Sequence, residues 1–295
     1  MATIPGSHYV ATAPGQPVNV VETMTGMGLP PAAPGAFNLE VFVGGAASSH
    51  VAPGYQGLAV LSPSGLELDL ISGAFAVTDN GTGSDTISAY GANETISGSG
   101  SGVTLNLFGD SEVAQGGGGS DTINVFGTAD SVTGGAGSDT INVFAAHDTV
   151  TAGSGSDTIN VFASSDTING GTGSDLINVF GSSSQINQGT GSDTINVIGN
   201  ADTVTAGSSA GANQGLVNFS GANMTFADGG NKFADTVVGF DQSAGDRIHL
   251  TTDTVADAVA HSTQVHGGAD TMITLSDGST ILLKGVSHID PSFFS

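Results

Sequence analysis

Residues 134–144 read GGAGSDTINVF, and nearly the same letters return at 116–126, 152–162, 170–180 and 188–198. The aspartates of these five copies recur at every eighteenth position: Asp121, Asp139, Asp157, Asp175 and Asp193. A fixed period of this kind indicates a solenoid, in which each repeat is one small unit that stacks on the next. The repeat alone therefore indicates the fold class.

Each repeat unit divides into two halves of nine residues that share a pattern. The first half follows GGxGSDTIN and the second VFxxxDTVT, and a second set of acids lies nine residues after the first: Asp130, Asp148, Asp166 and Asp202, with Ser184 as the exception. An isoleucine or valine lies two residues after each of these positions, as expected for short strands with one buried face. Strands nine residues apart must alternate between two sheets, so we expect an all-β, parallel, two-sheet coil in which one turn takes one whole repeat unit of eighteen residues.

Three regions are expected along the 295 residues. Residues 1–79 contain eight of the nine prolines and form a predicted proline-rich tail and β cap, with strands at FNLEVFV (37–43) and GLAVL (57–61). Residues 80–205 form the repeat. Residues 206–295 form a degenerate turn and a C-terminal cap, because the period is lost from about Phe219, and SDG (276–278) predicts a hairpin turn there.

The charge balance excludes several classes of protein. The net charge is −24, and the only basic side chains are those of Lys232, Arg247 and Lys284. Binding to nucleic acid requires Lys and Arg against phosphates, so we expect no nucleic-acid partner. No apolar stretch approaches the roughly 18 residues of a membrane span, so no membrane insertion is expected. Cysteine is absent, and metal binding is the alternative means of stabilising such a chain outside the cell.

The glycine–aspartate loops are the candidate metal sites. Glycines at alternate positions permit φ > 0 and leave backbone carbonyls free, and the aspartate adds a carboxylate. Hard oxygen ligands without nearby His or Cys favour Ca²⁺. The candidate ligands are Asp85, Asp121, Asp139, Asp157, Asp175 and Asp193, with Gly117, Gly119, Gly135, Gly137, Gly153, Gly155, Gly171, Gly173, Gly189 and Gly191.

At these residues the sequence resembles the repeats-in-toxin (RTX, hemolysin-type calcium-binding) family and its Gly-Gly-x-Gly-x-Asp-x-U-x nonapeptide. The resemblance covers residues 80–205 and implies a right-handed parallel β-roll with Ca²⁺ between successive glycine loops. It also implies an extracellular protein exported by type I secretion machinery that reads a C-terminal signal. Residues 233–295 resemble the capping and secretion segment that follows such repeats.

The departures from the family pattern limit the number of metal sites. The second half of each unit has Val-Phe where the family repeats Gly-Gly, so we expect calcium along one edge only. On the other edge Asp130, Asp148, Asp166 and Asp202 are expected to bond turn amides or face water. Val103 stands where an aspartate belongs and interrupts the row. Five complete loops over 116–193 predict about four Ca²⁺ ions.

A second ladder has the same period: Tyr90, Phe108, Phe126, Phe144, Phe162, Phe180 and Ile198. We expect the rings to stack and to supply apolar burial that the glycines cannot provide. The alternative is a strip of aromatic rings that binds a ligand.

No enzyme is predicted. The chain has no His-Glu-x-x-His motif, and GSSAG (207–211) matches a hydrolase elbow only formally, because that motif requires a strand–turn–helix context. His261 and His266 have no adjacent acid, so both are expected to be solvated.

The leading hypothesis is therefore a secreted, non-catalytic protein that folds on extracellular Ca²⁺ and has a structural, surface or adhesion role. One alternative is a self-assembling surface-layer or biofilm matrix component. Another is an ice-binding or glycan-binding flat sheet, for which the candidate array is Thr122/Asn124, Thr140/Asn142, Thr158/Asn160 and Thr194/Asn196.

Overall fold

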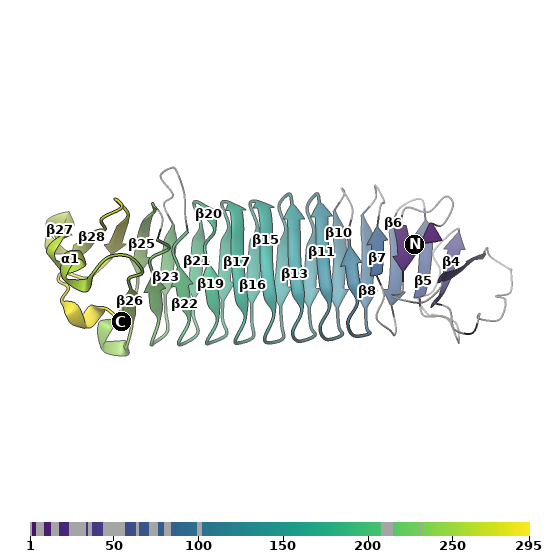
Figure 1. Cartoon of the computed structure of the whole chain (residues 1–295), viewed down its shortest axis with the longest axis horizontal. Helices are drawn as coiled ribbons and strands as arrows, with labels where there is room; N and C mark the ends of the chain where they lie inside the picture. Colours follow the sequence, from purple (N-terminus) through teal and green to yellow (C-terminus); the bar gives the residue numbers. More distant parts are fainter. Residues whose placement is uncertain are drawn as a thin grey trace. The chain divides into compact units, whose positions relative to one another are not determined.

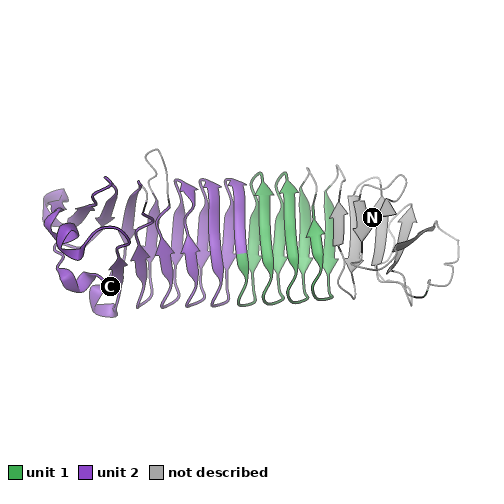
Figure 2. Ribbon diagram, viewed as in Figure 1, with its two compact units in different colours: residues 1–149 green, residues 150–295 purple. Residues whose placement is uncertain are grey.

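The computed structural model describes residues 84–98, 102–207, 215–230 and 232–295, together with Pro34 and the backbone of seven short strands before residue 84. The chain forms two compact units, residues 1–149 and 150–295 (Figure 2). Both units are built mainly from parallel strands (Figure 1), and each also contains antiparallel pairs.

In the first unit the repeat forms two parallel sheets. One contains β8 (Asp85–Ala89), β10 (Val103–Leu107), β12 (Thr122–Val125) and β14 (Thr140–Val143), and the other contains β9 (Thr95–Ser97), β11 (Val113–Gly118) and β13 (Ser131–Ala136). Ile123 pairs with Ile141, and the neighbouring Asn124 and Asn142 are hydrogen-bonded at a separation of 18 residues. The predicted two-sheet solenoid with this period is confirmed.

Seven strands precede the repeat: β1 (Ala2–Thr3), β2 (Tyr9–Thr12), β3 (Val18–Thr23), β4 (Phe37–Val43), β5 (Gly57–Ser62), β6 (Gly65–Leu70) and β7 (Ala76–Asp79). The predicted strands at 37–43 and 57–61 are β4 and β5. Strand β6 pairs in parallel with β8, and β7 pairs in parallel with β9, so parallel pairing already includes strands before residue 80.

The second unit has the same arrangement of two parallel sheets. One sheet contains β16 (Thr158–Val161), β18 (Leu176–Val179), β21 (Thr194–Val197), β23 (Leu216–Phe219) and β25 (Ala234–Val238). The other contains β17 (Thr167–Gly173), β19 (Gln185–Asn187), β22 (Thr203–Thr205), β24 (Thr225–Ala227) and β26 (Arg247–His249), and β20 (Thr190–Gly191) pairs with β17. Strand β15 (Thr149–Gly155) spans the boundary between the units.

The parallel coil extends past residue 205, the predicted end of the roll. Asn196 pairs with Asn218 at a step of 22 residues, which is longer than the step within the repeat. The step from β24 to β26 is also 22 residues, so the strands keep their register although the sequence loses its period. A search for a fixed spacing cannot detect turns of this kind.

The C-terminal cap closes one sheet. Strand β29 (Thr280–Leu283) pairs in parallel with β25, and β28 (Asp270–Thr274) and β27 (Ser262–Val265) follow by antiparallel pairing. The predicted hairpin turn at 276–278 is confirmed, with Gly278 at φ +87°. The cap also contains the unpredicted helix α1 (Val255–Ala260) and the 3₁₀ turns η1 (Gln242–Ala244), η2 (His266–Gly268) and η3 (Pro291–Phe293).

The core consists of aliphatic side chains that point inward from both sheets. In the first unit Ile123, Val125, Ile141 and Val143 are fully buried. Strand alternation puts the residue after Val125 on the outside, and this is the position of the aromatic ladder.

The aromatic rings stack as predicted, but they are not buried. Tyr90, Phe108, Phe126 and Phe144 stack with ring centroids 4.8–5.0 Å apart, and the Phe162 and Phe180 rings are 5.2 Å apart. The exposed fractions of the six aromatic residues lie between 43% and 50%. The prediction that the ladder supplies apolar burial is therefore wrong, because each ring begins a turn on the outside of the coil.

The asparagines of the Thr/Asn array form amide ladders. In the first unit Asn124 donates to Asn106 and Asn142 donates to Asn124, at 2.9 and 3.0 Å. The second unit repeats the pattern at Asn178, Asn196 and Asn218. These amides therefore hydrogen-bond along the sheet, which occupies groups that an ice or glycan ligand would need.

Candidate metal centre

The coil has two kinds of turn. The glycine-loop edge comprises the turns at 116–121, 134–139, 152–157, 170–175 and 188–193. The short-turn edge comprises the turns at 90–94, 108–112, 126–130, 144–148, 162–166, 180–184 and 198–202. Each kind of turn places an acidic side chain inside the coil.

All ten predicted glycines of the glycine-loop edge have φ between +86° and +144°. L-residues rarely adopt this conformation, so the loops require glycine. The space is equally restrictive: a Cβ on Gly137 would overlap the carbonyl oxygen of Gly119, and a Cβ on Gly173 would overlap that of Gly155. Backbone carbonyls therefore crowd together between consecutive loops within each unit.

The aspartates of this edge are buried, with exposed fractions of 2–3%. One carboxylate oxygen accepts a backbone amide from the preceding turn: Asp121 accepts from Val103 at 2.8 Å, and Asp175 accepts from Asp157 at 2.9 Å. The second oxygens of Asp121 and Asp175 are buried and accept no hydrogen bond. Burial raises the pKa of Asp175 to about 6 and also raises the pKa of Asp121 and Asp193.

This donor set fits a hard cation. It combines carboxylate oxygens with glycine carbonyls, and the sequence has no Lys or Arg before Lys232. Among the described residues, no three acidic or histidine side chains gather closely enough to hold a metal by themselves. A metal at this edge would therefore need the backbone carbonyls, which the glycine loops present.

The aspartate row has the predicted interruption and one unpredicted member. Val103 pairs with the buried Asp85 and stands between it and Asp121. Beyond the repeat, Asp235 accepts the amide of Gly215 at 2.9 Å, and burial raises its pKa to about 6. The segment ADTVVGF (234–240) matches SDTINVF closely enough that a search without a fixed period could have found it.

The short-turn edge has a different backbone. The residue before each acid, and before Ser184, has φ between +59° and +69°, although none of these residues is glycine: Asn93, Ser111, Ala129, His147, Ser165, Ser183 and Ala201. The left-handed region therefore contains ordinary side chains at this edge.

The aspartates of the short-turn edge bond amides, as predicted. Asp130 accepts from the Glu112 amide at 2.7 Å, and Asp202 accepts from the Ser184 amide at the same distance. The alternative that they face water is wrong, because Asp130, Asp148, Asp166 and Asp202 are at most 1% exposed. Burial raises the pKa of Asp130 and of Asp202 to about 6.

Two glutamates begin this row and were not predicted. Glu94 and Glu112 occupy the positions equivalent to Asp130, in GANETIS (91–97) and GDSEVAQ (109–115), and both are fully buried. Aligning these segments with GTADSVT (127–133) reveals the equivalence, provided that Glu is allowed to replace Asp.

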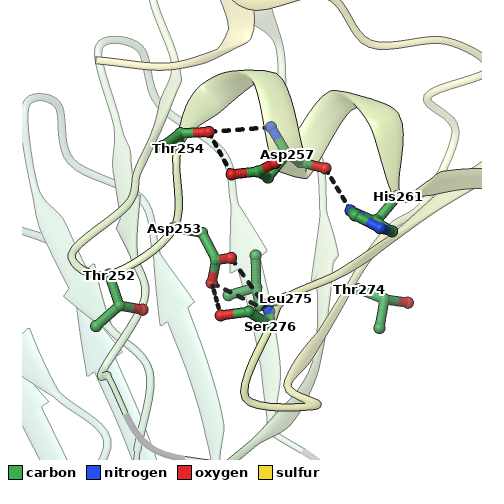
Figure 3. Close-up of a pocket in the computed structure, with 8 residues that line it drawn as sticks. All are labelled: Thr252, Asp253, Thr254, Asp257, His261, Thr274, Leu275 and Ser276. Carbon is green, nitrogen blue, oxygen red and sulfur yellow. Dashed lines mark hydrogen bonds between the residues drawn. The ribbon is translucent and has the colours of Figure 1, made fainter.

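A separate pocket of about 450 Å³ lies in the C-terminal cap (Figure 3). Asp253 accepts hydrogen bonds from the amide and hydroxyl of Ser276, and Nδ1 of the exposed His261 lies 2.9 Å from the Asp257 carbonyl oxygen. His266 is also exposed, as predicted, and its Nδ1 lies 2.7 Å from Oδ2 of Asp270, four residues later in the chain. The GSSAG motif lies outside the described residues from Ser208 onward.

These observations define a parallel β-solenoid with oxygen-lined glycine loops. A family model of the RTX calcium-binding nonapeptide repeat matches residues 81–101, 108–141 and 144–177. The repeat region therefore carries RTX calcium-binding nonapeptide repeats. No curated protein matches the chain significantly. Within the described residues, helices long and apolar enough to cross a membrane are absent.

Proposed function

We propose that this chain is a secreted, non-catalytic protein that folds on extracellular Ca²⁺ and has a structural, surface or adhesion role. The ions, about four over residues 116–193, lie between consecutive glycine loops. Their ligands are the loop aspartates and the carbonyls of the loop glycines.

The buried carboxylates of the glycine-loop edge carry this proposal. Asp121 and Asp175 each hold an oxygen that is buried and accepts no hydrogen bond, in a region without basic side chains. A buried charge without a partner opposes folding, and a divalent cation removes that cost. Extracellular calcium modules bind at about 10⁻⁴–10⁻³ M, so folding would occur outside the cell and not in the cytosol.

The test is a calcium titration followed by circular dichroism. We expect a largely unfolded chain in chelator and a β-rich spectrum in millimolar Ca²⁺. Asp175→Asn should raise the calcium midpoint of folding by about tenfold or more, since about 1.4 kcal/mol of binding energy is a factor of ten. Asp202→Asn is the matched control, because Asp202 is equally buried, also has a second oxygen that accepts no hydrogen bond, and lies on the edge that lacks glycine loops. A β-rich spectrum that chelator leaves unchanged would refute the proposal.

Export through type I secretion machinery is part of the same proposal and rests on the family resemblance. A chain that folds only in external Ca²⁺ remains unfolded in the cytosol and can cross the envelope in that state. Secretion of the whole chain should be compared with secretion of a chain lacking residues 262–295. Equal secretion of the two chains would contradict a signal in this segment.

A second candidate function is self-association at a surface or in a matrix. The observation that favours it is the exposed ladder, in which the exposed fractions of Phe108, Phe126 and Phe144 are 43%, 43% and 46%. Light scattering in Ca²⁺ should then detect assemblies, and the triple change of these phenylalanines to alanine should remove them. Monomers in wild-type samples at millimolar Ca²⁺ would exclude this candidate.

A further inference from the structure

The first two acids of the short-turn edge are glutamates, and their carboxyl groups have a different environment from those of the aspartates. At Asp130 the short side chain brings Oδ1 to within 2.7 Å of the Glu112 amide. Glu94 and Glu112 are one methylene longer, and all four of their carboxyl oxygens are buried without accepting a hydrogen bond. Both residues have an exposed fraction of 0%. A negative charge on either carboxyl group would therefore be removed from water without a compensating hydrogen bond.

The two glutamates occupy equivalent positions in consecutive turns. Thr95 pairs with Val113 in the parallel ladder. The preceding residues, Glu94 and Glu112, therefore lie one above the other at a strand spacing of about 4.8 Å. The Val113 amide donates to the Glu94 carbonyl oxygen at 2.8 Å, which fixes this register. The two carboxyl groups contact each other inside the coil, where two negative charges would repel each other with little screening.

Among the described residues, the ionisable groups nearest this pair are acids. Asp130 follows in the row, and its charge acts on Glu112. Asp110 is in the same turn as Glu112 but is exposed, and His147, in a later turn, is exposed as well. On the other side, strand β7 pairs with β9, and the residue before β7 in the sequence is Phe75, which has no ionisable group. No Lys or Arg precedes residue 232, so this part of the chain has no basic side chain of that kind to neutralise the pair.

Protonation removes the unfavourable charge. Burial raises the pKa of Glu112 to about 9, and the charges of Glu94 and Asp130 act in the same direction. Burial likewise raises the pKa of Glu94 to about 8. The nearby amides of Gly91 and Gly109 lower one value each, but the effect of burial is larger. A protonated carboxyl group donates one hydrogen bond and still accepts others, so two such groups in contact can satisfy each other.

We propose that Glu94 and Glu112 are both protonated in the folded protein at neutral pH and hydrogen-bond to each other, so that protons join the turns 90–94 and 108–112. The chain between these two turns passes through Val103, which stands on the glycine-loop edge where an aspartate of that row is missing. The glutamate pair thus links neighbouring turns at the point where the row of candidate metal ligands is interrupted. The link does not rest on whether the glycine loops bind Ca²⁺.

The pair makes this part of the coil sensitive to alkaline pH. The ordinary pKa of a glutamate is 4.5, whereas the folded values are about 8 and 9, so the folded state binds more protons than the unfolded state between these limits. The stabilisation is therefore complete below about 4.5 and is lost as the pH rises through about 8–9. Above that range two buried charges in contact oppose the stacking of the turns.

Infrared spectroscopy detects the protons directly, because the C=O stretching band of a protonated carboxyl group is separate from the carboxylate and amide bands. We expect this band in the folded full-length protein at pH 7 in millimolar Ca²⁺, and we expect it to disappear as the pH rises through about 8–9. Glu94→Gln/Glu112→Gln should remove most of the band at pH 7, because glutamine keeps the shape of the neutral acid but has no carboxyl group. Asp110→Asn is the matched control: Asp110 is an exposed acid of the same turn that accepts from Thr128, so the band should remain.

The pH profile of stability is the second measurement. In millimolar Ca²⁺ the urea midpoint of the wild type should fall between pH 7 and pH 10. The double glutamine variant should lose most of that fall, because its two amides keep a neutral hydrogen-bonded contact at every pH. Asp110→Asn should retain the wild-type profile.

The contrary outcome is a pair of glutamates that is ionised in the folded protein. The wild type would then have no protonated-carboxyl band at pH 7 beyond that of the double variant, or the double variant would keep the wild-type pH profile. Either result would overturn the proposal. If the double variant does not fold, the wild-type spectrum still decides, because a band that is absent at pH 7, or that persists unchanged to pH 10, contradicts the protonated pair.

Discussion

The two edges of the coil both bury carboxyl groups, but they do so with different backbone conformations. The glycine-loop edge uses glycines at φ +86° to +144°, which leave room only for carbonyl oxygens. The short-turn edge uses ordinary residues with φ between +59° and +69° and places the acid directly after them. Yet both rows are at most 4% exposed, and both bond the amide of the preceding turn. Burial of carboxylates alone therefore does not distinguish the two edges; the backbone conformation around them does.

A change of pH should have the largest effect on the stability of the calcium-free chain, because every buried carboxyl group on both edges contributes to it. Burial raises the pKa of Asp175 and Asp202 from 3.8 to about 6, so the folded state binds more protons than the unfolded state between these values. In calcium-free buffer, stability should therefore rise as the pH falls from above 6 towards 4. Glu94 and Glu112 extend the window upward to about 8 and 9.

The measurement is circular dichroism in chelator at pH 8 and at pH 5. We expect more β structure at pH 5, where protons replace the cations. A calcium-free chain that is more folded at pH 8 would show that the rows do not carry the unfavourable charge described above.

Glycine substitutions, one at each edge, should have the next largest effect on the free energy of unfolding. Gly137→Ala places a Cβ against the Gly119 carbonyl at φ +123°, and we expect a loss on the order of 3 kcal/mol in the free energy of unfolding. Ala129→Gly relieves a left-handed alanine at φ +62°, and the gain is offset by the entropy of glycine, so the net change should stay within about 1 kcal/mol. Urea unfolding in saturating Ca²⁺ measures both.

Substitution of an exposed aromatic ring on the short-turn edge should have the smallest effect on the free energy of unfolding. Phe126 stacks on Phe108 and Phe144 but is 43% exposed, so Phe126→Ala should cost about 1–2 kcal/mol from two stacking contacts. Ile123→Ala, in the core of the same turn, should cost about 2–5 kcal/mol. Equal losses in the two variants would mean that the rings are shielded in solution, as self-association would require.

The sequence predicts most of the fold because its period is strict. Strand alternation places Ile123 and Ile141 in the core, and the same rule applied to Phe126 would have placed that ring outside. The candidate aspartates were found by spacing, whereas Asp235 was missed because longer turns break the spacing. Glu94 and Glu112 were missed because the second row was sought as aspartates only, although both glutamates fit its spacing. Helix α1 follows a local signal, the Thr254 side chain that accepts the Asp257 amide, which a search for repeats ignores.

Near-identical turns create an ambiguity of register during folding. A strand that pairs one whole turn too early keeps its inward residues inward and meets a nearly identical neighbour, so the alternation of side chains cannot reject the error. The residues that depart from the repeat on the short-turn edge can reject this error. A slip of one turn would move the Ser184 hydroxyl away from the Asp166 amide and would move the Asp130 carboxylate from the Glu112 amide to the Glu94 amide. The residues that break the repeat thus specify which turn stacks on which, and replacing them with the consensus aspartate would remove that information.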